Sequence, residues 1–248
     1  MKTSNPALPA NTFTALRYQA ERSESMTVQG TVIKTILLLL LCLLSAGWTW
    51  MKFYQSGGNG AAITPYLGIG VLGGFVVALV TAFKKEWSAI TAPLYAVLQG
   101  LFIGGLSAQL ETMYPGIVIQ AAGLTFGTLF SMLIVYQTGL IRATENFKIG
   151  VMAATGGIAI FYLVTMVLSF FGVQVSFMYS NSWLSIGISL FVIAIAALNF
   201  IIDFDFIEQG ASQDVPKYME WYGAFAMMVT LVWLYIEFLR LLSKVRQR

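Results

Sequence analysis

Long apolar segments alternate with short polar connections along almost the whole chain. Within the segments the apolar residues are continuous and lack the alternation of barrel strands, and a helix needs about 20 of them to cross a bilayer. The pattern predicts seven spanning helices, at residues 31–54, 62–83, 91–111, 115–138, 149–171, 181–204 and 218–242. We therefore expect an all-α bundle of seven transmembrane helices at 31–242, between a polar N-terminal tail at 1–30 and a basic C-terminal tail at 243–248.

The composition also indicates a protein that lies in lipid. Of the 248 residues, 58% are hydrophobic and 10% are charged, and the mean hydropathy is +0.77. A soluble domain averages about 45–50% apolar and about 25% charged residues. Because too few charged residues remain to cover a water-facing surface, the lipid bilayer is the main expected partner. The net charge of +3 does not indicate a nucleic-acid partner.

The residue types that carry most protein chemistry are scarce. The chain has no histidine and one cysteine, Cys42. The commonest metal ligand and general base is therefore missing, and an internal disulfide is excluded. We expect no enzyme activity, no catalytic residues, no cofactor and no resident metal.

Lysine and arginine residues are divided unevenly between the two ends of the predicted helices. With the N-terminus in the cytoplasm, nine of the 14 basic residues lie on the cytoplasmic side and five on the other. This orientation satisfies the positive-inside rule, although it leaves the basic C-terminal tail outside. An inward tail would require a re-entrant hairpin at 218–242, where there is no proline. We therefore expect seven complete spans and a cytoplasmic N-terminus.

Three of the predicted helices carry glycines four residues apart. The pairs are Gly70 and Gly74, Gly100 and Gly104, and Gly123 and Gly127. Such pairs let neighbouring helix backbones approach closely in lipid. Hinges or a substrate path are the alternative, and helix packing is the interpretation that we favour.

Acidic residues gather around the end of the sixth predicted helix. Five of the 11 acidic residues lie between positions 203 and 220, and together they would form an electronegative mouth that attracts cations. Asp203 lies about one to two turns inside the helix, and Asn199 lies one turn earlier on the same face, whereas Asp205 points the opposite way. Because ionisable residues within a span are costly, Asp203 is a candidate for the ion path or for pH sensing.

Two further polar residues lie within the predicted spans. Glu237 precedes Arg240 by three residues, so an ion pair within one helix would explain its presence. Gln99 lies inside the third span. Its amide could hydrogen-bond across a helix interface or line a path, and the sequence leaves both possibilities open.

Four segments, read together, resemble the Bax inhibitor-1 family of membrane proteins, and most closely its bacterial YccA-like branch. The matching segments are residues 26–35, before and at the start of the first span, 92–105 in the third span, 203–208 at the end of the sixth, and 234–238 in the seventh. The order of seven spans matches as well, so the resemblance covers most of the chain.

The resemblance implies a central seventh helix ringed by the other six, in the inner membrane of a bacterium. It also implies a cation leak, chiefly for calcium, that is gated by pH through a carboxylate pair on the sixth and seventh helices. Asp203 and Glu237 match the two members of that pair, and relatives often have Glu in place of Gln99. The family is further associated with suppression of cell death and with membrane-protein quality control, including restraint of a membrane-bound protease.

Depth along the helices argues against contact between Asp203 and Glu237. Glu237 lies 19 residues beyond Tyr218, which is about 28 Å along a helix, whereas Asp203 lies near the cytoplasmic end. Glu220 is closer to the level of Asp203. We therefore expect Glu220 or Asp205 to be the coupling partner of Asp203, with Glu237 as a separate group paired with Arg240.

Two functions remain open from the sequence. The leading hypothesis is a cation leak for calcium or protons, in which Asp203 changes its protonation state within about pH 5–8 because burial and like charge disfavour the ionised form. The alternative is a non-conducting quality-control protein, whose N-terminal tail binds and modulates a membrane-bound protease.

Overall fold

The computed structural model describes residues 25–171 and 182–247, and seven long helices dominate this part of the chain. The helices are α2 (Val28–Gln55), α3 (Thr64–Phe83), α4 (Ser88–Met113), α5 (Ile117–Gln137), α6 (Glu145–Phe170), α8 (Trp183–Ser212) and α9 (Met219–Arg246). All seven are long and apolar enough to cross a membrane. The predicted all-α, seven-span architecture is confirmed.

Several helix ends differ from the boundaries expected from the sequence. Helix α2 begins at Val28, where the Thr27 side chain accepts a hydrogen bond from the Gly30 N–H. This contact satisfies one of the free donors of the first turn. Helix α8 continues past the acidic positions to Ser212, and α9 runs to Arg246. Most of the basic tail expected at 243–248 is therefore the last turn of α9.

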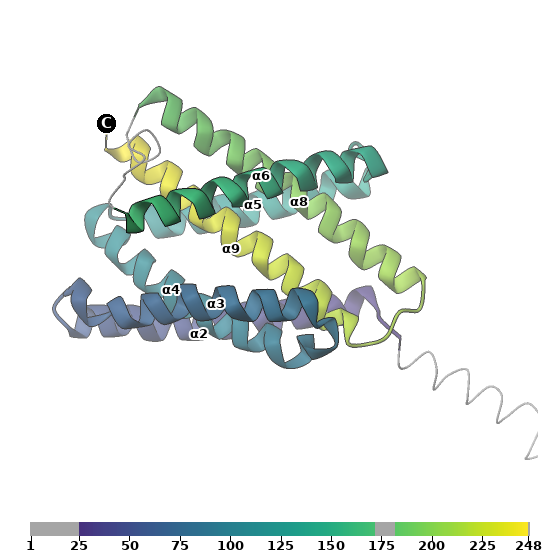
Figure 1. Cartoon of the computed structure of the whole chain (residues 1–248), viewed down its shortest axis with the longest axis horizontal. Helices are drawn as coiled ribbons and strands as arrows, with labels where there is room; N and C mark the ends of the chain where they lie inside the picture. The colour runs from purple at the N-terminus through teal and green to yellow at the C-terminus, as the bar shows by residue number, and fades with distance from the viewer. Residues whose placement is uncertain (1–24, 172–181, 248) are drawn as a thin grey trace, which may run out of the picture.

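The helices form two layers with one helix between them. Figure 1 shows α2, α3 and α4 in one layer and α5, α6 and α8 in the other, while α9 runs diagonally between the layers. Helix α9 packs against α2, α4, α5 and α8. In the apolar window of α9 56% of the residues are buried, the largest share among the seven spans. The central position expected for the seventh helix is confirmed.

Glycines allow the close approach of the helices in the first layer. A Cβ atom on Gly100 or Gly104 would collide with the backbone of α2 at Cys42 or Ala46. A Cβ on Gly70 or Gly74 would likewise collide with α4. These close contacts agree with the packing role predicted for the two pairs.

The third glycine pair does not have the predicted role. A Cβ on Gly123 or Gly127 would meet no atom of the described residues within 4 Å. Both glycines are exposed on α5, on a face that points away from the other helices. The packing interpretation is therefore wrong for this pair, because spacing alone does not reveal which face of a helix meets a neighbour.

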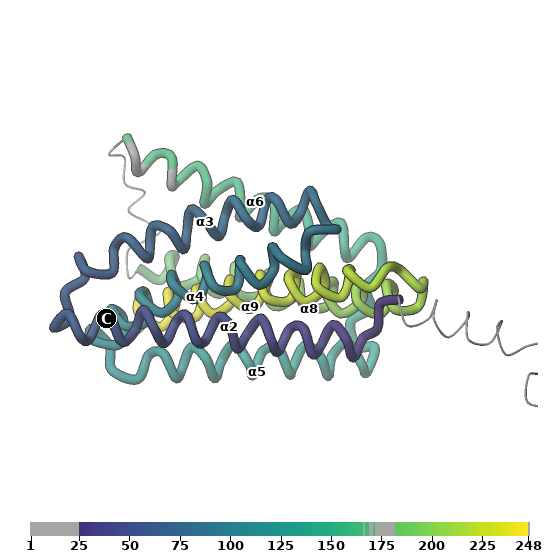
Figure 2. The backbone as a smooth tube through the Cα atoms, turned by 90° about the horizontal axis from the view of Figure 1, so that it is seen from below, coloured from purple at the N-terminus to yellow at the C-terminus, as the bar shows by residue number. Residues whose placement is uncertain are grey.

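The start of α2 and the end of α9 lie at opposite ends of the bundle (Figure 2). We call the end that holds the start of α2 the N-terminal end, and the other the C-terminal end. At the N-terminal end, the Met26 N–H donates to the Val215 carbonyl at 2.8 Å, beside an isolated β-bridge between Ser25 and Pro216. The segment before α2 is thereby tied to the connection between α8 and α9.

Candidate functional site

Asp203 lies at the interface of α8 and α9. Its Oδ2 atom accepts a hydrogen bond from the Thr230 hydroxyl of α9 at 2.7 Å. Because α8 continues to Ser212, nine residues beyond Asp203, the carboxyl group is about 14 Å from the end of the helix. Asp203 therefore lies deeper in the bundle than the sequence indicated, at the level of Thr230 near the middle of α9.

Asn199 extends this polar contact toward α6. Its Nδ2 atom donates to the Thr155 hydroxyl of α6 at 2.8 Å and to the Ile195 carbonyl at 2.8 Å. Thr155, Asn199, Asp203 and Thr230 thus form a line of polar side chains across three helices, which we call the α8 polar row. The prediction that Asn199 and Asp203 share a helix face agrees with this arrangement.

Asp205 points away from the α8 polar row, as expected from its place two residues along the helix. Its carboxylate forms an ion pair with Lys148 of α6 at 2.7 Å, and it accepts a hydrogen bond from Gln209 at 2.7 Å. The neighbouring Glu208 accepts a hydrogen bond from the Tyr136 hydroxyl of α5. These contacts fasten the outer face of α8 to α5 and α6 at the N-terminal end of the bundle.

Glu220 binds the start of α2. Glu220 is 1% exposed, and its carboxyl group accepts hydrogen bonds from the Thr27 N–H at 3.0 Å and the Thr27 hydroxyl at 2.9 Å. It also forms an ion pair with Lys34. Glu220 and Asp205 are each paired with a lysine, and the structure shows no direct contact of either carboxylate with Asp203, so their coupling to Asp203 stays a prediction.

Glu237 forms the ion pair that its spacing predicts. The Arg240 Nη1 atom lies 2.8 Å from Glu237 Oε1, and the Tyr162 hydroxyl of α6 donates to the same oxygen at 2.9 Å. Arg240 also donates to the Tyr162 hydroxyl at 2.6 Å. Glu237 lies seven residues beyond Thr230, about 10 Å along α9, so the structure does not bring it to Asp203. Their axial separation is nevertheless shorter than the sequence indicated, because Asp203 lies deeper.

Gln99 lies at the interface of α3 and α4. A Cβ atom on Gly74 would fall 2.5 Å from the Gln99 Nε2 atom, so this side chain fills the space that the glycine leaves. The structure does not bring Gln99 to the α8 polar row. Its contact with Gly74 favours the packing interpretation over a place in an ion path.

The partners that sequence reasoning missed at these sites include Lys34, Thr155 and Thr230. Lys34 carried a usable signal, since a lysine six residues inside α2 requires an acidic partner within the membrane. The two threonines carried none, because threonine is common in spanning helices and often binds its own helix backbone. Among residues 25–171 and 182–247 the structure shows no group of three or more side chains suited to hold a metal ion.

The chain was compared with known proteins at the level of families, sequences and structures. A family model described as Bax inhibitor 1 like matches residues 5–247, which is nearly the whole chain. No curated protein and no solved structure matches the chain.

Proposed function

The chain belongs to the Bax inhibitor 1 like family, and from this premise we propose that it is a pH-sensitive cation leak in which Asp203 is the titrating group. Calcium is the proposed cation. The α8 polar row is the proposed site of gating. We place the protein in the YccA-like branch and in a bacterial inner membrane, with its N-terminus in the cytoplasm.

One observation carries this proposal. Asp203 is a carboxyl group within a span, and the contact that the structure shows for it is a neutral hydroxyl, that of Thr230. By contrast, Asp205 and Glu220 each form an ion pair with a lysine, and Glu237 forms an ion pair with an arginine. An unneutralised carboxylate within a membrane is costly, so a group of this kind is suited to exchange a proton or a cation.

The proposed mechanism follows from the hydrogen-bonding capacity of a carboxyl group. Ionised Asp203 accepts the hydrogen bond from Thr230, whereas protonated Asp203 becomes a donor as well. Asn199 is the other polar neighbour in the row, and it is already bonded to Thr155 of α6. Protonation therefore alters the contact between α8 and the central helix α9, and this change shifts the balance between closed and conducting states.

The arrangement of acidic residues at the N-terminal end supports a cation rather than an anion as the transported species. Asp205 and Glu208 line a cavity of about 440 Å³ there, beside Tyr136 and Arg142. Arg142 and the Lys148 partner of Asp205 offset part of this negative charge, and with this end in the cytoplasm the remaining acidic charge would attract cations to the cytoplasmic side of α8.

The test is calcium flux into dye-loaded liposomes that contain the purified protein, measured across pH 5–8 (about the range in which a perturbed carboxyl group would titrate). Asp203→Asn removes the titrating group while it keeps the shape and a hydrogen bond to Thr230, so we expect a flux that no longer depends on pH. Asp205→Asn is the matched control on the same helix, outside the α8 polar row, and it should keep the pH response.

Two outcomes would overturn the proposal. One is a pH response that persists in Asp203→Asn. The other is the absence of calcium flux into the liposomes, together with a membrane-bound protease that co-purifies with the protein. This result would favour the quality-control function.

A further inference from the structure

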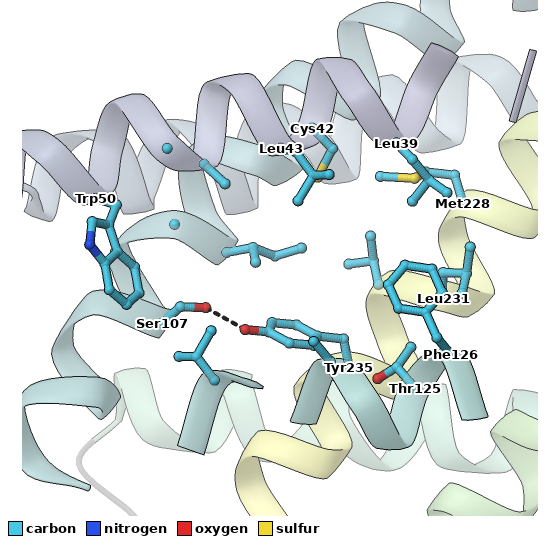
Figure 3. A pocket seen from close by; sticks show the side chains of 17 residues that line it. Leu39, Cys42, Leu43, Trp50, Ser107, Thr125, Phe126, Met228, Leu231 and Tyr235 are labelled. Carbon is cyan, nitrogen blue, oxygen red and sulfur yellow. Dashed lines mark hydrogen bonds between the residues drawn. The ribbon is translucent and has the colours of Figure 1, made fainter. Parts of the chain in front are cut away.

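A cavity lies between α2, α4, α5 and α9, in the half of the bundle toward its C-terminal end. Its volume is about 320 Å³. Helices α4 and α9 form the floor, and α2 and α5 form the two sides. Figure 3 shows Leu39, Leu43 and Trp50 on one side, Thr125 and Phe126 on the other, and Met228, Leu231 and Tyr235 behind them.

The lining offers mainly hydrocarbon contacts, and its hydroxyl groups are paired. The Ser107 and Tyr235 hydroxyls bind each other at 2.8 Å (Figure 3), and Thr125 donates to its own helix at 2.8 Å. No buried polar side-chain atom lacks a partner in the part of the chain that the structure describes. An apolar cavity of this kind does not hold water, so its ligand must be hydrocarbon.

The cavity opens sideways, between α2 and α5. Leu43 and Phe126 line it and are 64% and 41% exposed, respectively. Gly47 also lines it, and a Cβ atom there would meet nothing within 4 Å. Because both helices span the membrane, this opening faces the acyl chains of the bilayer rather than water.

The depth of the cavity matches that of one lipid leaflet. From Leu39 to Trp50 the lining of α2 covers 12 residues, and the 11 steps between them span about 16 Å of helix. Half of a hydrocarbon core of about 30 Å is about 15 Å. Trp50 lies five residues before the end of α2, where a tryptophan suits the headgroup level. The cavity thus runs from one membrane interface toward the middle of the bilayer.

The volume of the cavity also fits a hydrocarbon ligand. A cavity of about 150 Å³ accepts benzene, and on that scale the present cavity holds roughly a dozen carbon atoms. A single acyl chain that reaches from the interface to the midplane has this length and bulk. A transmembrane helix, at about 10 Å across, is too wide to enter.

We propose that this cavity binds one acyl chain of a membrane phospholipid, taken from the leaflet at the C-terminal end of the bundle. The bound chain fills a space that would otherwise be an empty and destabilising void between the two layers. It contacts α9 at Met228, Leu231 and Tyr235, on the helix face opposite Thr230. The site goes beyond the proposed leak and does not depend on it.

The test uses phospholipid vesicles that contain the full chain and a fraction of a phospholipid with a photoactivatable diazirine in the middle of one acyl chain. After irradiation, the adducts are mapped by mass spectrometry. We expect adducts on the floor residues Met228, Leu231 and Tyr235, which a chain reaches only from inside the cavity.

A matched pair of substitutions makes the test specific. Gly47→Leu places a branched side chain in the mouth of the cavity. We expect the yield of floor adducts to fall at least about fivefold. Gly123→Leu makes the same change on exposed α5, where a Cβ also meets no neighbour, and it should leave the adducts unchanged. If Gly47→Leu does not fold, Ala122→Phe fills the cavity from α5 and replaces it.

Three results would overturn the proposal. The first is labelling of lipid-facing Leu44 and Leu72 in the unaltered chain without any floor adduct. The second is equal floor labelling in Gly47→Leu and Gly123→Leu. The third is the absence of floor adducts together with an oxidant-induced disulfide between two copies of the chain that carry a cysteine at exposed Leu43, which would show that protein rather than lipid covers the opening.

Discussion

At the scale of single residues, the acidic groups within the spans differ in what holds them. Glu220 is enclosed at the start of α9 by Lys34 and by two hydrogen bonds from Thr27. Glu237 is enclosed by Arg240 and Tyr162. Both groups are paired with a basic side chain, whereas Asp203 contacts the Thr230 hydroxyl, which is the basis of the titrating role that we propose for it.

Glu220→Gln should lower stability strongly. The substitution leaves the Lys34 ammonium group, which is 16% exposed, without its carboxylate, and the loss of one partner of a buried pair costs roughly 3–5 kcal/mol. Thermal unfolding in detergent would measure the effect, with Glu86→Gln in the connection before α4 as control. Adding Lys34→Met should restore part of the lost stability, because it removes the unpaired positive charge. Failure of the double variant to recover would show that the Thr27 contacts, rather than the ion pair, dominate.

Glu237→Gln should lower the melting temperature while the leak keeps its pH response. The change removes the carboxylate that holds Arg240, which is 30% exposed, so the loss should be smaller than at Glu220. Melting and the liposome flux assay would be run on the same preparation. Loss of the pH response in this variant would mean that Asp203 meets Glu237 in another state of the protein.

At the scale of elements, two kinds of helix contact hold the first layer and the central helix. Helices α2, α3 and α4 meet through glycines with almost no side-chain volume between the backbones. Helix α9 instead contributes large buried side chains such as Met228, Leu234 and Phe238 to the core. The first kind tolerates no added atom, while the second allows small repacking, which the proposed shift of α9 with Asp203 would require.

Gly104→Val should therefore prevent normal assembly of the first layer. Its side chain would collide with the α2 backbone at Ala46, and a forced overpacking of this kind costs about 1–3 kcal/mol or more. The control is Gly127→Val on α5, where a Cβ meets no described atom within 4 Å. The yield of monodisperse protein and its melting temperature would compare the two. Equal behaviour would contradict the close contact of α2 and α4.

At the scale of the whole molecule, the seven spans place the two ends of the described chain on opposite sides of the membrane. The basic C-terminal residues do not form a loose tail. Lys244 donates to the Ser185 carbonyl and the Ser189 hydroxyl of α8 at 3.3 and 2.9 Å. Arg246 donates to the Pro115 carbonyl and to Gln120 of α5. In the proposed orientation, these contacts would accommodate Lys244 and Arg246 on the side that the positive-inside rule disfavours.

Cysteine labelling should confirm this orientation. After Cys42→Ser, which removes the single native thiol, cysteines placed at Gly58 and Gln247 should react with a membrane-impermeant maleimide from outside the cell. A cysteine at Arg142 should react only after the membrane is opened. The physical basis of this expected orientation is that it places nine basic residues on the cytoplasmic side of the membrane and five on the other side. Protection of position 247 together with labelling at 58 would contradict seven complete spans.

The sequence by itself determined the features that depend on local spacing. Seven helices follow from the length of each apolar segment. The contact of Glu237 with Arg240 follows from a separation of three residues on one helix. The outward direction of Asp205 relative to Asp203 follows from the helical period. None of these requires knowledge of which helices are neighbours.

Only the tertiary structure decided which face of each helix meets protein and which meets lipid. In a bilayer both faces are apolar, so the hydrophobic pattern does not distinguish Gly104, against α2, from Gly123, which faces open space. The same ambiguity hid Thr230 as the partner of Asp203 and Lys34 as the partner of Glu220. It also hid the cavity between α2 and α5, which exists because α9 crosses diagonally and separates the two layers.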